Sequence, residues 1–187
     1  MDVFAAEVQK RAKVARQRTC PIGDLIGADM ESAYLEYKST LRWDIKQQAK
    51  GKIPEDAVIK TIAGFANARF GGTLLVGVAD DGTIHGLEDD YATFSKRGQV
   101  GDQDLWGQHL LNLIRSRLGD AAVALVSWEF HTNGDDIARI SIEPADFPIY
   151  ERKGDTETFW QRTPVSTIAI TDHEQRDRII ARRWGKQ

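Results

Sequence analysis

An unbroken apolar run near the middle of the chain constrains the fold more than any other feature. Residues 73–78 read Thr-Leu-Leu-Val-Gly-Val, with Gly71-Gly72 before the run and Asp81-Gly82 after it. A strand that is apolar on both faces is stable only when both faces are covered. We therefore expect a buried central strand, which is entered through a glycine turn that needs positive φ. A tight turn at Asp81-Gly82 then leads into a short strand at residues 83–85.

Hydrophobic periodicity elsewhere predicts one α+β domain, a mixed β-sheet with packed helices. Helical spacing indicates helices over residues 3–18, 54–67, 104–118 and 171–184. Apolar alternation indicates further strands over residues 34–38, 123–130, 137–142 and 159–161. Residues 42–53 have little periodicity, so we expect a loop there.

Several local details of these elements can also be predicted. Residues 1–20 form a helical arm that precedes a domain of residues 21–187, and its role is open between packing, dimerisation and binding a partner. Phe4 and Val8 lie near one stripe of this helix with two alanines, so we expect that stripe to pack. Pro54 is expected to open the second helix, and Asn67 to act as a cap or turn residue at its end. The last helix is expected to open with a capping box that starts at Thr171.

Composition limits the function classes. The chain has 187 residues, of which 41% are hydrophobic and 28% are charged, as in ordinary globular proteins. A single cysteine, Cys20, cannot form an internal disulfide, and this predicts a reducing, cytoplasmic location. No window approaches the roughly 20 apolar residues that cross a bilayer, so no membrane contact is expected. The four histidines lack zinc-ligand spacing, and Cys20 has no partner motif for a nucleophilic role.

The net charge of −3 argues weakly against a nucleic-acid partner, but the distribution of charge matters more. Residues 38–52 carry one acid and five basic side chains, which are candidate phosphate contacts. A solvated loop explains the same pattern nearly as well. Trp43 lies in this segment and is a candidate for stacking on a base, with packing as its alternative. The basic residues are Lys38, Arg42, Lys46, Lys50 and Lys52.

Acidic side chains form the second candidate group. On a strand over residues 34–38, Glu36 and Lys38 project from the same face. Glu31 precedes this strand, and Asp80 follows the central strand, whereas Asp81 belongs to the turn. Carboxylates that converge can hold Mg²⁺ or Mn²⁺, and a lysine beside them can stabilise charge on a phosphate. Taken alone, a Glu-x-Lys pair is common on solvent-facing strands.

Three spaced segments resemble the Schlafen-type Alba-like domain. Residues 31–39 read Glu-Ser-Ala-Tyr-Leu-Glu-Tyr-Lys-Ser, residues 61–67 read Thr-Ile-Ala-Gly-Phe-Ala-Asn, and residues 71–82 read Gly-Gly-Thr-Leu-Leu-Val-Gly-Val-Ala-Asp-Asp-Gly. The segment 85–89 and the pair Ser166-Thr167 are also similar. Two positions depart from the pattern, because Tyr37 stands where phenylalanine is usual and Ala79 where relatives often have Asp.

The resemblance implies nucleic-acid binding, to RNA or DNA. In the nuclease branch it implies metal-dependent endoribonuclease cleavage of tRNA or rRNA, with Glu31, Glu36 and Asp80 as catalytic metal ligands beside Lys38. Such nucleases often clamp RNA between two lobes, so this single domain would need a homodimer. The alternatives are a non-catalytic module that binds DNA, RNA or a nucleotide, and assembly through the N-terminal helix. The family has also been linked to ATP, but the chain has no Gly-x-x-x-x-Gly-Lys phosphate loop.

Overall fold

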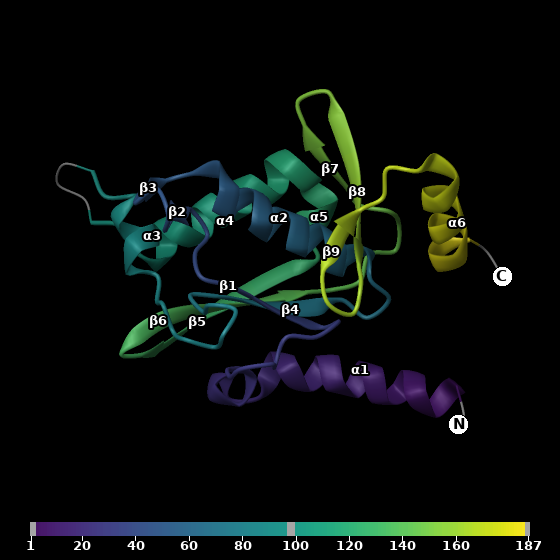
Figure 1. Cartoon of the computed structure of the whole chain (residues 1–187), viewed down its shortest axis with the longest axis horizontal. Helices are drawn as coiled ribbons and strands as arrows, with labels where there is room; N and C mark the ends of the chain where they lie inside the picture. The colour runs from purple at the N-terminus through teal and green to yellow at the C-terminus, as the bar shows by residue number, and fades with distance from the viewer. Residues whose placement is uncertain (1–2, 97–99, 186–187) are drawn as a thin grey trace.

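The computed structural model describes residues 3–96 and 100–185. Its central strand is the expected one: β4 (Gly72–Val76) is buried along its whole length. β4 pairs in parallel with β1 (Leu35–Lys38) and antiparallel with β6 (Asp135–Ile142). β5 (Val126–Asn133) pairs with the other side of β6, so the sheet has the order β1-β4-β6-β5. The fold is therefore α+β with a mixed sheet, as the sequence predicted, and β1 lies at one edge (Figure 1).

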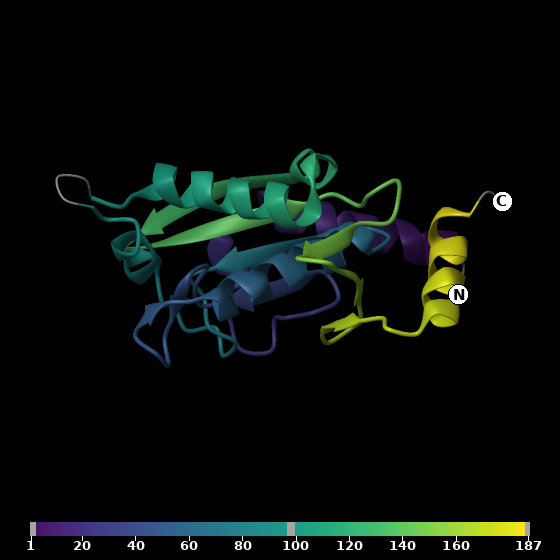
Figure 2. The same ribbon diagram turned by 90° about the horizontal axis from the view of Figure 1, so that it is seen from above.

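Helices cover both faces of this sheet (Figures 1 and 2). α2 (Lys52–Asn67) and α4 (Gln103–Leu118) lie on one face, where the larger apolar core forms. α1 (Val3–Thr19) and the short 3-10 helix η1 (Ile22–Leu25) lie on the other face, over a smaller core. Strand alternation separates the two cores, because Leu74 belongs to the first and Leu75 to the second.

A second, three-stranded sheet packs against α2 and brings the C-terminal part of the chain to β1. It consists of β7 (Tyr150–Lys153), β8 (Thr156–Arg162) and β9 (Thr167–Ala169). A glycine in α2 permits this close packing, since a Cβ added at Gly64 would lie 2.5 Å from Thr167 Cγ2. Of the three strands in this sheet, only the middle of β8 was predicted from the sequence.

The remaining elements are short or peripheral. The hairpin of β2 and β3 follows β1, α3 precedes α4, α5 precedes β5, and α6 ends the described chain. Their bounds are β2 (Trp43–Asp44), β3 (Ala49–Lys50), α3 (Glu88–Ala92), α5 (Asp120–Val123) and α6 (His173–Trp184).

The arm helix was predicted correctly, but its packing face was not. Phe4 and Val8 are 74% and 49% exposed, whereas Val14 and Gln17 are buried. The helix end is fixed by Arg139 of β6, which donates to the carbonyl oxygens of Arg18 (2.8 Å) and Cys20 (2.7 Å). Polar contacts of this kind produce no periodic pattern of apolar residues, so the sequence could not indicate this buried face. The division into an arm of residues 1–20 and a domain of residues 21–187 stays a prediction.

Asn67 was expected to cap or turn the end of α2 but instead joins α2 to the second sheet. Its side chain is buried, donates to Ile149 O (2.8 Å) and Trp160 O (2.9 Å), and accepts from Ile149 N (2.8 Å). Gly71 behaves as expected, with φ at +72° in the turn before β4.

Other boundaries differ by a few residues. α2 begins at Lys52 rather than Pro54, because Gly51 already has the extended backbone of an N-cap. Residues 120–123 are helical, so β5 starts at Val126 and not at residue 123. The last helix is capped by Asp172, whose side chain accepts from Gln175 N, rather than by Thr171.

The turn at Asp81-Gly82 is present, but the strand expected after it is reduced to a single bridge between Val78 and Ile84. Within the described residues no helix combines the length and the hydropathy that crossing a membrane requires.

Candidate nucleic-acid interface

Glu36 lies on edge strand β1 between two cations. Its Oε1 accepts from Lys38 Nζ at 2.7 Å, and its Oε2 accepts from Arg162 Nη1 at 2.6 Å. Burial by itself would raise the pKa of the Glu36 carboxyl, but Lys38 and Arg162 outweigh burial and lower it. Glu36 is therefore a carboxylate held in place from both sides.

Arg162 is the residue that the sequence could not place. It ends β8, and its side chain is only 2% exposed. Besides Glu36, it donates to Ser32 O at 2.5 Å and stacks 4.8 Å from the centre of the Phe65 ring. The guanidinium group thus links the second sheet to the loop before β1. No local pattern could reveal this pairing, because 126 residues separate Arg162 from Glu36.

Glu31 and Asp80 lie near this pair. Glu31 accepts a hydrogen bond from Tyr37 N at 2.7 Å, so it fixes the loop before β1 against the strand itself. Burial raises the pKa of Glu31, and the negative charges of Glu36 and Asp80 raise it further, against the effects of Tyr37 N–H and Lys38. Asp80 is exposed in the turn after β4. Asp81 accepts from Thr83 N at 2.8 Å, as its expected role in the turn requires.

Carboxylates are the right kind of ligand for Mg²⁺ or Mn²⁺. In the part of the chain that the structure describes, however, no three acidic, histidine or cysteine side chains come close enough together to hold a metal ion. Both oxygens of Glu36 are already hydrogen-bonded to cations. The three acids, as they are arranged here, do not fit a resident metal.

The basic segment after β1 is organised by Asp90, a fully buried acid of α3 that the sequence analysis missed. Its Oδ1 accepts from Arg42 N and Trp43 N, each at 2.8 Å. Its Oδ2 accepts from Leu41 N at 2.7 Å and from Trp106 Nε1 at 3.0 Å. Asp90 therefore fixes the backbone from which the β2–β3 hairpin projects. No pattern of neighbouring residues indicates that a single carboxylate will accept hydrogen bonds from four N–H groups.

The predicted phosphate contacts divide into two groups. Arg42 is held by Glu55 (3.5 Å) and stacks 4.9 Å from the Phe94 ring centre. Lys46, Lys50 and Lys52 are exposed, and no ion pair forms with them among the described residues. We call these three lysines the lysine arm. Trp43 is half-buried, and its carbonyl accepts from Thr40 Oγ1 at 2.6 Å.

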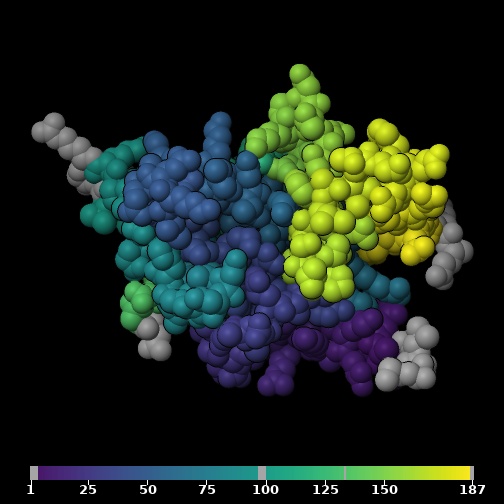
Figure 3. Space-filling view, in the orientation of Figure 1, coloured from purple at the N-terminus to yellow at the C-terminus, as the bar shows by residue number. Residues whose placement is uncertain are grey.

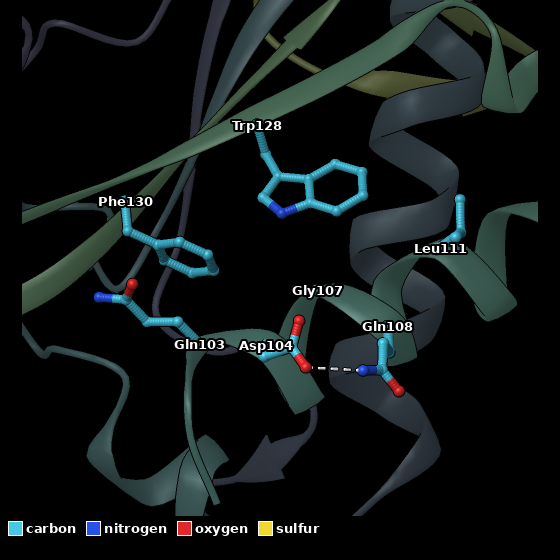
Figure 4. A pocket seen from close by; sticks show the side chains of 7 residues that line it. All are labelled: Gln103, Asp104, Gly107, Gln108, Leu111, Trp128 and Phe130. Atoms are coloured by element: carbon cyan, nitrogen blue, oxygen red, sulfur yellow. Dashed lines mark hydrogen bonds between the residues drawn. The ribbon is translucent and has the colours of Figure 1, made fainter.

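A hollow lies between α4 and β5 (Figure 4). It measures about 420 Å³, and Trp128 and Phe130 form its aromatic wall. The opposite wall carries Asp104, which accepts from Gln108 at 2.8 Å. None of the described side chains that line this hollow is basic.

The fold and this surface define a class: an α+β domain that presents a fixed Glu-Arg pair at its edge strand and exposed lysines in the segment that follows this strand. The chain belongs to the Schlafen AlbA_2 family, whose family model matches residues 31–171. Membership of this family suggests nucleic-acid binding.

Among solved structures, the chain is similar to the DIP2311 protein from Corynebacterium diphtheriae, with 19% identity and a TM-score of 0.48. The match covers 74% of this chain and 25% of that protein, so the chain spans about a quarter of its length. The comparison with curated proteins found no match.

Proposed function

We propose that this chain binds structured RNA of the tRNA or rRNA type, or DNA, along the face formed by β1 and the lysine arm. The observation that carries the proposal is the exposure of Lys46, Lys50 and Lys52 in the segment that follows residues 41–43, whose backbone Asp90 fixes. Exposed lysines on a rigid support can replace the counterions of a phosphate backbone at little cost in ordering. Family membership supports the same class of ligand.

Charge reversal of the lysine arm tests this proposal. Binding of a fluorescent RNA hairpin and of a DNA duplex is measured by anisotropy for the wild type and for the variant K46E/K50E/K52E. The matched control is K10E/K13E/R16E, which reverses three exposed charges on α1, across the sheet from the lysine arm (Figure 1). We expect a loss of at least about tenfold in the arm variant only. Equal affinities of the arm variant and the wild type would refute the proposed surface.

We propose a metal-dependent endoribonuclease as a second candidate function, because the resemblance to the Schlafen family implies one, with Glu31, Glu36 and Asp80 as its acids. In the described part of the chain, the side chains do not bring three ligands for Mg²⁺ or Mn²⁺ to one point. Purified chain is incubated with labelled tRNA and Mn²⁺, beside E36Q, D80N and the turn variant D81N. Cleavage that persists in D81N and disappears in E36Q and D80N supports this candidate, and cleavage by all variants or by none contradicts it.

A clamp around folded RNA would require two copies of this single domain. We propose a homodimer on RNA, and sedimentation of the complex measures its stoichiometry. A ratio of one chain per RNA would contradict the dimer. The alternative of a regulatory ATP-binding module predicts a calorimetric signal with ATP alone.

A further inference from the structure

A basic and aromatic hollow lies at the opposite end of β1 from the lysine arm. It measures about 360 Å³, within the range of about 300–1,000 Å³ that is typical of ligand sites. Its walls come from the loop before β1, the end of α2, β8 and α6. α6 stands beside β8 and β9 on the face shown in Figure 3, and the hairpin of the lysine arm lies on the same face.

The charge of this hollow is one-sided. Among the described residues, four arginines line it and no acid does. Two of them are paired: Arg69 with Glu7 at 2.9 Å, and Arg162 with Glu36 at 2.6 Å. The other two are Arg182, for which the described residues show no ion pair, and Arg183.

Arg183 is held in place by main-chain carbonyl groups. It donates to Ala145 O at 3.2 Å and to Ala68 O at 3.5 Å, and its buried Nε has no partner in the described structure. Burial lowers the pKa of Arg183, and the positive charge of Arg69 lowers it further, against an opposing effect of Asp146. A bound anion would relieve this repulsion.

The aromatic side of the hollow is suited to a flat ring. Tyr34 and Phe70 meet edge to face, with ring centres 6.2 Å apart and planes at 68°. Phe159 also lines the hollow. Aromatic faces beside guanidinium groups are the combination that holds one base and its phosphate in single-strand binding proteins.

From these observations we propose that the hollow binds one phosphate-bearing nucleotide of the nucleic-acid strand that crosses β1. The phosphate lies against Arg182 and Arg183, and the base lies against Tyr34 and Phe70. This assignment rests on the proposed function and gives the bound strand a second point of contact.

The geometry of β1 sets the distance between the hollow and Lys38, at the end of β1 that precedes the lysine arm. The strand rises about 3.3 Å per residue, so Tyr34 and Lys38 are about 13 Å apart. A nucleic-acid strand rises about 3.4 Å per nucleotide in a duplex, so about four nucleotides span this distance. Arg162 lies between the two ends and lines the hollow while it holds Glu36. A hexanucleotide is therefore long enough to reach both the hollow and the end of β1.

The experiment measures calorimetric binding of a single-stranded RNA hexamer, adenosine 5′-monophosphate, adenosine, inorganic phosphate and phosphotyrosine to the whole chain. The variants are R182E and R183Q in the hollow, with R178E as the matched control, because Arg178 is exposed on α6 and does not line the hollow. We expect R182E and R183Q to weaken hexamer binding about tenfold each and R178E to leave it unchanged. The monophosphate should bind at least about tenfold more tightly than adenosine.

Two results would overturn the assignment. In the first, R182E binds the hexamer as tightly as the wild type does. In the second, phosphotyrosine or free adenosine monophosphate binds as tightly as the hexamer. The latter would make a peptide or a free nucleotide the ligand. The K46E/K50E/K52E variant separates this inference from the proposed function. If that variant loses RNA binding while R182E does not, the hollow assignment alone is wrong.

Discussion

Replacement of Asp90 by asparagine tests how the binding face is built. The substitution keeps the volume of the side chain but exchanges one carboxylate oxygen for an NH₂ donor. Each oxygen of Asp90 accepts two N–H groups, so either orientation of the amide leaves two buried or partly buried donors without an acceptor.

The expected cost follows from those two donors. A buried donor that loses its acceptor costs about 1–3 kcal/mol, so D90N should lower the free energy of unfolding by about 4 kcal/mol. The neighbouring D89N is the control, because Asp89 is exposed and its one ion pair within the described residues is with His85 at 3.3 Å, so its effect should stay below about 0.5 kcal/mol.

Urea unfolding followed by circular dichroism measures both variants. A loss below about 1 kcal/mol for D90N, at an unchanged urea dependence, would refute the role given to Asp90. Under conditions in which D90N remains folded, we also expect weaker RNA binding although every lysine is retained, because the backbone of the arm loses its anchor.

Two further predictions concern stability. G64A should destabilise the protein by about 1–3 kcal/mol, because its Cβ would lie 2.5 Å from Thr167 Cγ2; G23A, which meets nothing within 4 Å, should not change the midpoint of thermal unfolding. D56N should destabilise the protein at pH 7 and lose this effect near pH 2. Burial alone would raise the pKa of Asp56, but hydrogen bonds from a lysine and an arginine outweigh burial and lower it. The contribution of Asp56 to the free energy of unfolding is therefore fully present above its ordinary pKa of about 3.9 and disappears as the pH falls through the lowered pKa. The free energies of unfolding of the wild type and of D56N are measured from pH 2 to 7. A difference between them that does not change with pH would contradict this prediction.

The sequence predicted those parts of the fold that depend on local apolar patterns. The buried run of β4, the periodic helices α2 and α4 and the glycine turn at Gly71 are each determined by neighbouring residues, and the structure confirms them. β7 and β9 escaped prediction because they are short and their pairing with β8 depends on packing against α2. The buried face of α1 was also not predicted, because polar contacts rather than an apolar stripe hold the helix in place.

The candidate site was predictable only in part. The positions of Glu36 and Lys38 on one strand follow from the period of two, and the resulting ion pair lies on β1. Arg162 and Asp90 are as important to the site, yet Arg162 is 126 residues from Glu36, and the backbone N–H groups that Asp90 holds lie 47–49 residues before it. Long-range partners of this kind follow from the assembled sheets and helices, not from spacing. The role of Glu31, Glu36 and Asp80 as metal ligands stays a prediction, and among the described residues no three acidic, histidine or cysteine side chains form a group that could hold a metal ion.

The salt dependence of RNA binding tests the central claim, that the lysine arm contacts phosphate, most directly. For a single-stranded RNA, each phosphate contact adds about 0.7 to the slope of the logarithm of affinity against the logarithm of salt concentration. Removal of three contacts in K46A/K50A/K52A should therefore make the slope shallower by about 2. A variant with the slope and the affinity of the wild type would show that the strand binds elsewhere.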